Sequence, residues 1–484
     1  MLCLRTLSLA LAILAIFFST PLSAGVVVNP NNNGATDVLP ADPTRWTDDT
    51  DAYVGKTALG ELLVDGTSQV QSYYGYLGYN SAATGIVTVD GAGSLWDNTC
   101  YYYVGYYGDG TLNVTDGATV DCGLTSRIAY RSGSTGMVNI TGTNSVMAAH
   151  MILVGDYGDA TLNITNGGTA NSSTGHIGYQ TSSNSTATVD GNGSAWNLSS
   201  HLKIAYQGTG TLNITGGGQV HVAGITKINE NGTIHLDGGT LEGGALTMAN
   251  EDRLSGTGSI LLHGIISSGD VTLDSPDDLT RQYSLTGPGQ NIDVQYDING
   301  QGILGAGGIG SGLLTISNGL TVMSEDGYIG WERDSLGTVT VTGTDSTWIN
   351  NDSLYVGLLE DAVLNITDGG RVETDNCYLC QNGNMTATLS VDGPGSVLKS
   401  EYFSICPMGQ ATIQITNGGK ITSEEAYLKA NSSQTSDITV EGTNSKWTNS
   451  EDMYVSTRGK VTMLISDGGA VSNDHGYHHG RSHR

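Results

Sequence analysis

Short stretches of the chain alternate apolar with polar residues and then end in a glycine turn. The clearest one covers 110–120, where Leu112 and Val114 alternate with Thr and Asn. A period of two is typical of a half-buried β-strand. Asp116-Gly117 follows, and glycine can adopt a positive φ there without a steric penalty. The pattern therefore predicts a short strand that ends in a tight turn.

This strand and its turn return at a fixed spacing. Leu112, Leu162 and Leu212 of the first three copies stand 50 residues apart. Further copies cover 363–370, 412–419 and 462–469. Self-similarity at a fixed period is the signature of a repeat architecture.

A second marker, a branched residue followed by a small one, recurs about every 25 residues. The pairs are Val54-Gly55, Leu77-Gly78, Val104-Gly105, Ile128-Ala129, Val154-Gly155, Ile177-Gly178, Ile204-Ala205, Ile329-Gly330, Val356-Gly357, Leu379-Cys380, Ile405-Cys406, Leu428-Lys429 and Val455-Ser456. The 50-residue repeat is therefore a pair of coils. One coil carries the strand above, and its partner carries Val-Thr-Val-Asp-Gly-x-Gly-Ser-x-Trp at 87–96 and 187–196, with looser copies at 338–348 and 438–447.

Coils of this length are too short to bury a core alone, but stacked in parallel they close a continuous one. We predict an all-β fold, a right-handed parallel β-helix (β-solenoid), with the hand taken from the preference of parallel crossovers. An antiparallel barrel fits less well, because identical units favour in-register parallel stacking. A propeller would need blades of about 40–50 residues, and the markers at half that period count against it.

Five tryptophans each lie eight residues before a branched–small pair: Trp46, Trp96, Trp196, Trp348 and Trp447. Trp331 is out of phase, while Val146 and Leu398 fill the same slot in other coils. A slot that accepts Trp, Val or Leu is typical of a coil interior. The alternative is a row of exposed aromatic platforms that stack on sugar rings.

These patterns divide the chain into six predicted segments. They are a signal peptide at 1–24, a linker at 25–45, a first repeat block at 46–220, an irregular glycine-rich β segment at 221–312 that continues the solenoid, a second repeat block at 313–472 and a His-rich tail at 473–484.

The N-terminal segment is typical of a secretory signal. Arg5 precedes the apolar run 7–18, and small residues stand before Gly25. A membrane anchor is the alternative, and the shortness of the run disfavours it. No later stretch is long and apolar enough to span a bilayer. We therefore expect a secreted or surface protein without a membrane span in the mature chain.

The composition is acidic and rich in glycine. Asp and Glu outnumber Lys and Arg by 47 to 19, and 70 of the 484 residues are Gly. An acidic surface repels the phosphates of nucleic acids and of anionic lipids. We therefore expect no nucleic-acid partner.

The alternation of Gly-Thr-Leu-Asn-Ile-Thr-Asp-Gly-Gly with Val-Thr-Val-Asp-Gly-x-Gly-Ser-x-Trp resembles the autotransporter and PEP-CTERM-associated repeat of exported bacterial proteins. The resemblance covers about 50–220 and 313–472. It implies a β-helical passenger at the bacterial cell surface or in the matrix, with an adhesive role and no catalytic residues to transfer. The sequence departs from that family in showing neither a C-terminal barrel nor a Pro-Glu-Pro sorting tail. Release, retention by a partner and a longer chain all stay open.

Since β-helices also carry polysaccharide lyases and hydrolases, clustered carboxylates are a candidate catalytic site. The densest group is Asp274, Asp277 and Asp278 near Arg281, and Pro276 favours a solvated turn there. The repeat aspartates all precede Gly and are turn formers first: Asp90, Asp116, Asp190, Asp368 and Asp392. Stacked carboxylates could hold Ca²⁺, but the spacing matches no calcium-binding nonapeptide. We expect no cofactor and no metal, with Ca²⁺ as the alternative.

Nine tyrosines concentrate within 73–107. If they face outward, a subset forms a patch for a glycan or a surface or matrix protein: Tyr73, Tyr74, Tyr76, Tyr101, Tyr102 and Tyr103. The alternative is that some are core and the rest scattered surface. The triplets Asn-x-Thr at Asn113, Asn139, Asn163, Asn213 and Asn365 could be glycosylation acceptors, but the strand consensus explains their recurrence.

Cys380 and Cys406 both occupy the small position of the marker, one coil apart. Stacking would bring their Cα atoms to about 5 Å, within disulfide range, and export permits oxidation. The alternative is that Cys serves only as a small residue. Cys100 and Cys122 are also about one coil apart, but are offset by two positions.

Together these patterns predict an exported, non-catalytic β-solenoid for surface display, adhesion or matrix structure. A polysaccharide-active enzyme and an inert spacer are the alternatives. A carboxylate cluster in a groove would favour the enzyme.

Overall fold

The computed structural model describes residues 25–478 apart from 32, 249–250, 288–289, 383–384, 406–408, 430–434 and 456–459. It is a β-solenoid of about 16 turns of parallel stacked coils, with a spacing of about 25 residues. The predicted all-β parallel fold is confirmed. Two compact units divide the chain: unit 1 holds the residues up to Val222 with 228–241 and 253–258, and unit 2 holds 223–227, 242–252 and those from 259 on. The predicted signal peptide at 1–24 lies outside the described residues.

Each coil contributes three short strands. The first carries the alternating stretch, the second carries the tryptophan slot, and the third ends at the branched–small pair. Inside the stack, a strand pairs in parallel with its equivalents one coil before and one coil after, as Leu112 does with Val87 and Val138. We call these stacks the first, second and third ladder of each unit.

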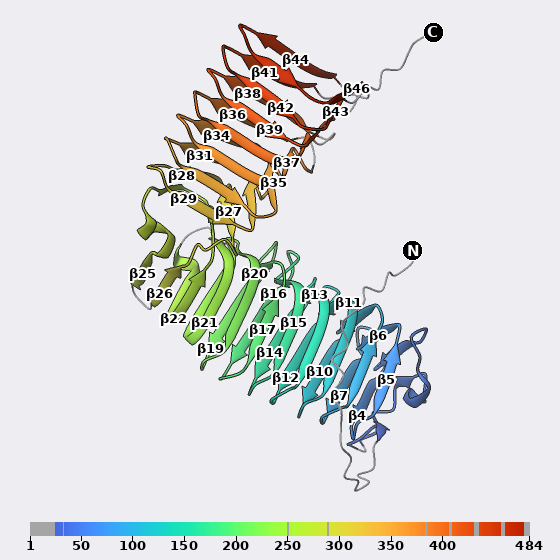
Figure 1. Cartoon of the computed structure of the whole chain (residues 1–484). Helices are drawn as coiled ribbons and strands as arrows, with labels where there is room; N and C mark the ends of the chain where they lie inside the picture. The colour runs from blue at the N-terminus through green and yellow to red at the C-terminus, as the bar shows by residue number, and fades with distance from the viewer. Residues whose placement is uncertain are drawn as a thin grey trace, which may run out of the picture. The chain divides into compact units, whose positions relative to one another are not determined.

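Figure 1 shows the ladders of unit 1 in blue to green. The first ladder contains β4 (Leu59–Val64), β7 (Thr84–Asp90), β10 (Asp109–Thr115), β12 (Thr135–Thr141), β14 (Asp159–Thr165), β16 (Asn184–Asp190) and β19 (Thr209–Thr215). The second contains β5 (Gln69–Ser72), β8 (Leu95–Asn98) and β17 (Ala195–Leu198), and the third contains β3 (Asp51–Val54), β6 (Tyr74–Leu77), β9 (Tyr101–Val104) and β18 (Leu202–Ile204). Three longer strands bend from the second ladder into the third: β11 (Thr119–Ile128), β13 (Val146–Val154) and β15 (Thr169–Ile177).

Unit 2 repeats this plan, with its first ladder visible as consecutive arrows in Figure 1. That ladder contains β24 (Asp270–Leu273), β28 (Ser311–Ile316), β31 (Leu336–Thr342), β34 (Ala362–Thr367), β36 (Thr386–Asp392), β38 (Gln410–Thr416), β41 (Thr435–Glu441) and β44 (Lys460–Ser466). The second contains β29 (Thr321–Ser324), β32 (Thr347–Asn350), β39 (Lys420–Ser423), β42 (Lys446–Asn449) and β45 (Ala470–Ser472). The third contains β23 (Ile265–Ser267), β27 (Ile303–Ala306), β30 (Asp326–Ile329), β33 (Ser353–Val356), β40 (Glu425–Leu428), β43 (Asp452–Val455) and β46 (His475–His478). The bent strands are β35 (Arg371–Leu379) and β37 (Val397–Ile405).

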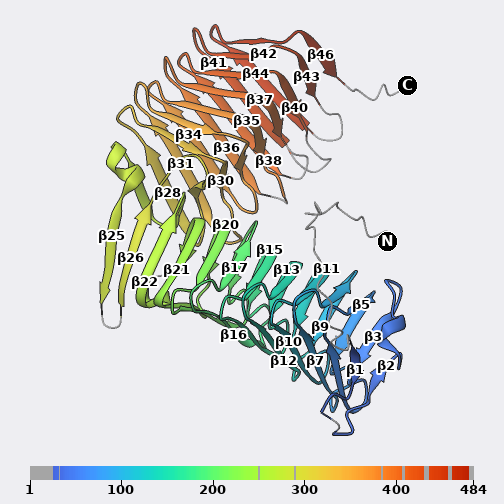
Figure 2. The same cartoon turned by 60° about the horizontal axis from the view of Figure 1, so that its bottom comes forward.

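The irregular segment 221–312 continues the parallel pairing and adds a hairpin. β21 (Gly232–Met248) pairs with β19, and β23 and β24 pair with β27 and β28. After η3 (Pro276–Thr280), β25 (Gln282–Gly287) and β26 (Gln290–Tyr296) pair antiparallel, side by side in Figure 2. β20 (Gln219–Ile228), β21, η2 (Glu251–Arg253) and β22 (Leu254–Leu262) contribute residues to both units. The boundary between the units therefore does not fall at 221 or 313.

Two predicted segment boundaries differ from the structure. Residues 25–45 are not a linker: β1 (Val26–Val28) pairs antiparallel with β4, and β2 (Val38–Leu39) with β3, before η1 (Pro43–Arg45). This cap forms because the first coil otherwise leaves its strand edges unpaired. At the other end, β46 pairs with β43, so the stacking extends into the predicted tail.

The tryptophan slot faces the coil interior, as predicted. Trp96, Trp196, Trp348 and Trp447 are 0% exposed, and Trp46 is 5% exposed. In the four repeat coils the indole N–H donates to the hydroxyl of a serine one coil earlier, at 2.8 to 3.3 Å. These serines are Ser72, Ser172, Ser324 and Ser423. Trp46 instead donates to the Pro40 carbonyl within the cap. The alternative of exposed aromatic platforms is wrong.

Candidate functional site

The predicted tyrosine patch lies on the third ladder of unit 1. Tyr53, Tyr76 and Tyr103 stack on successive coils, with ring centroids 4.9 and 5.1 Å apart. Beside them Tyr74 and Tyr101 also stack, 5.9 Å apart. All five rings are half-buried, because each outward ring is covered on its faces by the rings of neighbouring coils.

A second stack follows on the turn after the third ladder. Tyr79 and Tyr106 lie 4.9 Å apart and nearly parallel. Tyr106 meets Tyr76 and Tyr103 edge to face, at 86° and 87°. The two stacks therefore interlock as a rigid herringbone.

Tyr102 does not belong to the patch, and its prediction as a surface residue is wrong. It is 0% exposed and packs edge to face against Trp96, 5.0 Å away. The reason is the strand period: Tyr101 and Tyr103 point outward, so the residue between them points into the core. Burial also raises the pKa of Tyr102 well above its usual value.

Cations cover the ring faces that the herringbone leaves open. Lys56 lies over Tyr53 at 4.3 Å, and Arg131 lies over Tyr130 at 4.4 Å. Burial, with smaller contributions from neighbouring groups, raises the pKa of Tyr74 to about 12. The phenol of Tyr74 therefore stays neutral at ordinary pH. The patch offers ring edges and hydroxyl groups, and few open faces on which a sugar could stack.

Unit 2 carries a longer tyrosine ladder that the sequence analysis missed. Neighbouring ring centroids are 4.7 to 5.8 Å apart along the whole series. Its members are Tyr328, Tyr355, Tyr378, Tyr402, Tyr427, Tyr454 and Tyr477. We call this series the unit 2 tyrosine ladder.

A signal for this ladder is present in the sequence. Five of the tyrosines stand directly before the branched residue of the marker, as in Tyr355-Val356 and Tyr427-Leu428. Tyr402 could not have been found in that way, because Ser404 holds the equivalent position between Tyr378 and Tyr427. The ring of Tyr402, two residues earlier, completes the series.

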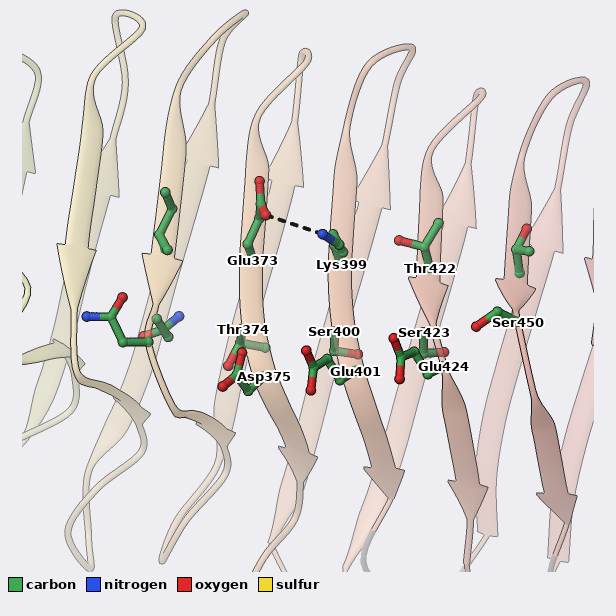
Figure 3. Close-up of a pocket in the computed structure, with 14 residues that line it drawn as sticks. Glu373, Thr374, Asp375, Lys399, Ser400, Glu401, Thr422, Ser423, Glu424 and Ser450 are labelled. Atoms are coloured by element: carbon green, nitrogen blue, oxygen red, sulfur yellow. Dashed lines mark ion pairs between the residues drawn. The ribbon is translucent and has the colours of Figure 1, made fainter.

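A groove of about 450 Å³ lies beside this ladder, where the second strand bends into the third (Figure 3). Each of five successive coils contributes the last outward residue of its second strand and the residue at the bend. These pairs are Ile349 with Asn351, Glu373 with Asp375, Lys399 with Glu401, Thr422 with Glu424, and Thr448 with Ser450. The groove thus presents a column of carboxylates at the bend.

The two basic residues of the groove region are engaged by a single carboxylate. Arg371 binds Glu373, and Lys399 Nζ lies 3.9 Å from Glu373 Oε2, the dashed line in Figure 3. The side chains of Asp375, Glu401 and Glu424 form no ion pair within the described part of the chain. The bend is therefore a strip of uncompensated negative charge.

The predicted acidic cluster at 274–281 is a helix cap. The Asp278 carboxylate accepts hydrogen bonds from the backbone N–H groups of Asp274 and Ser275, at 3.0 Å each. Ser275 in turn accepts from the N–H of Asp277, which completes a capping box at η3. The interpretation as a structural turn is confirmed.

The repeat aspartates and asparagines connect neighbouring coils. Asp90 and Asp190 accept from Thr115 and Thr215 of the next coil. Asn139 donates to Asn113 at 2.9 Å, and Asn163 and its equivalents form similar bonds. Within the described ranges, no group of three or more His, Cys, Asp or Glu residues is placed to hold a metal. The expected lack of a cofactor, and the Ca²⁺ alternative, both stay predictions.

The Cys380–Cys406 disulfide stays a prediction, because Cys406 lies outside the described residues. Cys380 is fully buried at a left-handed position with φ 58° and contacts the Gln410 carbonyl. Cys122 donates to the Cys100 carbonyl at 3.4 Å, and burial raises its thiol pKa to about 12. Across the part of the chain that the structure covers, no helix is long and apolar enough to cross a membrane.

Fold and faces together define a class: a parallel β-solenoid whose outer faces carry aromatic and acidic residues in register. The chain is 30% identical over 349 residues to the uncharacterized lipoprotein YdeK of Escherichia coli (strain K12). The match covers 68% of this chain, which spans only about a fifth (21%) of the length of that relative. No family model matches the chain, and no solved structure matches it. The autotransporter and PEP-CTERM resemblance therefore stays an expectation.

Proposed function

We propose that the protein is an exported, non-catalytic β-solenoid that displays its aromatic and acidic faces for attachment to a surface or matrix partner. The unit 2 tyrosine ladder carries the proposal. Tyrosine is enriched at protein interfaces, and here it repeats on successive coils of a rigid sheet. Repeated contacts of this kind add by multivalency even where each one is weak.

Export is supported by the predicted signal peptide and by the bacterial relative that is named a lipoprotein. We infer the absence of catalysis from the way in which polar and aromatic side chains are distributed over the surface. Side chains repeat from coil to coil along both tyrosine ladders, whereas a catalytic centre needs one unique constellation.

Attachment of fluorescently labelled protein to bacterial cells and to cell-free matrix tests the proposal. The variant Tyr355→Ser/Tyr427→Ser/Tyr454→Ser should attach at least about tenfold more weakly, because each lost ring removes interface area. Its matched control, Asn365→Ser/Ser390→Ala/Gln414→Ser, changes outward residues of the first ladder of the same unit. Equal attachment of both variants, with intact circular dichroism, would reject the proposal.

A polysaccharide-active enzyme is the second candidate, since the unit 2 groove holds Glu373, Asp375, Glu401 and Lys399. Paired carboxylates can act as acid and base on a glycosidic bond. Incubation with neutral and acidic polysaccharides, followed by chain-length analysis, separates the two. Cleavage that Glu401→Gln abolishes would establish the enzyme and overturn the proposed non-catalytic role.

A further inference from the structure

The unit 2 tyrosine ladder presents ring edges rather than ring faces. Each interior ring lies between two others at about 5 Å, and the pairs Tyr328–Tyr355 and Tyr427–Tyr454 are close to parallel, at 25° and 13°. A pyranose ring stacks on an open aromatic face, and in these pairs the facing ring faces are occupied, whereas Tyr402 is tilted from Tyr378 and Tyr427 by 52° and 31°. A partner along the ladder therefore meets phenol oxygens and C–H edges.

Two phenol hydroxyls of the ladder are used as donors toward carboxylates. Tyr454 donates to Asp452 at 2.8 Å, and Tyr328 donates to Asp326 at 3.3 Å. The bond to Asp452 raises the pKa of Tyr454 to about 12, so this phenol keeps its proton. What remains for a partner is the lone pairs of phenol and carboxylate oxygens. This part of the face accepts hydrogen bonds and offers few donors.

The bend beside the ladder adds a column of carboxylates. The strand register on both sides of the bend aligns Asp375 with Glu401, and Glu401 with Glu424. These carboxylates therefore occupy equivalent positions on successive coils, about 4.8 Å apart. Like charges at this spacing repel each other.

Unit 1 shows which group pairs with such a ladder. Arg127 takes the position equivalent to Tyr103 one coil later. Its guanidinium lies 5.3 Å from the ring of Tyr130 and binds the carboxylate of Asp156. An arginine set against a tyrosine and a carboxylate is therefore already part of this fold.

We propose that the carboxylates Asp375, Glu401 and Glu424, together with the unit 2 tyrosine ladder, bind an extended polypeptide segment rich in arginine or lysine. The groove takes the cationic side chains, which donate to the carboxylates. The ladder supports the remainder of the segment through phenol oxygens and apolar ring edges. This names the partner class of the attachment face and so rests on the proposed function.

The ladder sets the length of such a segment. Six steps of about 4.8 Å make a face about 30 Å long. An extended chain at about 3.3 Å per residue spans this distance with about nine residues. A labelled peptide of about 12 residues that alternates Arg and Ser is therefore a suitable test ligand.

Fluorescence polarisation with this peptide tests the inference on the whole chain from residue 25. Glu401→Gln/Glu424→Gln/Asp375→Asn should weaken its binding at least about tenfold at low salt. The matched control, Asp437→Asn/Glu441→Gln/Asp467→Asn, removes three charges from the first ladder and the turn after it, and should bind as the wild type does. Added salt should weaken wild-type binding steeply, because exposed charges are screened beyond about 10 Å at 0.1 M.

Equal weakening by both triple variants would overturn the inference, because it would show attraction to net charge alone. Equal binding of a peptide that alternates Glu and Ser would overturn it too, as would preferential binding of a neutral polysaccharide or of Ca²⁺ alone. Peptide binding without attachment to cells or matrix would reject only the proposed function. Attachment that survives the Glu401→Gln/Glu424→Gln/Asp375→Asn variant would reject only this inference.

Discussion

Single residues of the repeat act on the coil next to their own. The indole N–H of Trp196 is fully buried and donates to Ser172 Oγ at 3.2 Å. A buried indole without that acceptor would leave one donor unsatisfied. The Trp slot is therefore specified by two residues that stand one coil apart, and each is useful only when the coils stack.

Ser172→Ala should lower the free energy of unfolding by about 1–3 kcal/mol, because it leaves the Trp196 N–H without an acceptor. Trp196→Phe should also destabilise, through the lost donor and a smaller ring. The double variant should be destabilised by less than the sum of the two single effects, since the hydrogen bond is lost only once. Chemical denaturation of the three variants measures this, and strict additivity would show that the bond contributes nothing.

Tyrosine ionisation should limit the stability of the folded chain in alkali. Burial raises the pKa of Tyr74 from its ordinary value of 10.0 to about 12, and raises those of Tyr76 and Tyr328 as well. A folded-state pKa above the unfolded value stabilises the fold below pH 10, and that contribution is lost as pH rises through the folded value. Denaturation midpoints should therefore fall steeply above about pH 10. Near-ultraviolet absorbance should show a set of phenols that ionises only with unfolding; a single titration near 10 would contradict this.

At the scale of elements, the two half-repeats are complementary at their turns. The hydroxyl of Ser145 accepts from the Gly117 N–H of the preceding coil at 3.0 Å and donates to the Thr141 carbonyl. Ser194 makes the same pair of contacts with Gly167 and Asp190. The Asp-Gly turn of one coil thus needs the Gly-x-x-Ser turn of the next, which explains why the coils alternate.

Removal of the N-terminal cap should expose strand edges. β1 and β2 pair antiparallel with β4 and β3, and an unpaired edge of this kind is a template for other chains. A chain that lacks residues 25–41 should form oligomers or precipitate at concentrations where the intact protein stays monodisperse. Size-exclusion chromatography with light scattering measures this, and a monodisperse truncated chain would show that the cap does not protect the edge.

At the scale of the whole molecule, stacking turns a repeated sequence into continuous faces. Residues that recur every 25 positions form a column in which neighbouring residues are about 4.8 Å apart. Tyrosine columns mark the third ladder of both units, and in unit 2 a carboxylate column runs beside them. A small part of the chain's acidic residues, which outnumber the basic ones by 47 to 19, is thus aligned in one column on unit 2.

Export should remove residues 1–24, because Arg5, the apolar run 7–18 and the small residues before Gly25 are typical of a cleaved signal. The intact mass of the exported protein should show a chain that begins at Gly25. A mass that retains the first 24 residues would contradict the prediction.

Sequence alone predicted the coil, its strands and its buried slot. Leu112 and Val114 face inward because the period of two fixes their side, and Trp348 is buried because its slot keeps phase with Val356. The same period of two points Tyr102 into the coil. The prediction of Tyr102 as a patch residue is wrong because it groups the tyrosines by their proximity in the chain and not by the face of the strand on which each one lies. The cap was missed because its pairing is antiparallel and occurs only once.

What the sequence determined by itself was the unit: inward residues, turn glycines and the spacing that repeats them, all of which depend on local chain geometry. Tertiary structure alone decided which outward residues meet. The rings of Tyr355 and Tyr378 become neighbours, with centroids 5.3 Å apart. Tyr402 completes the series in the coil where Ser404 holds the position equivalent to Tyr378. The bend carboxylates form a groove only across several coils. Outward side chains add nothing to the hydrophobic period, so their alignment depends on the exact register of every coil in the stack.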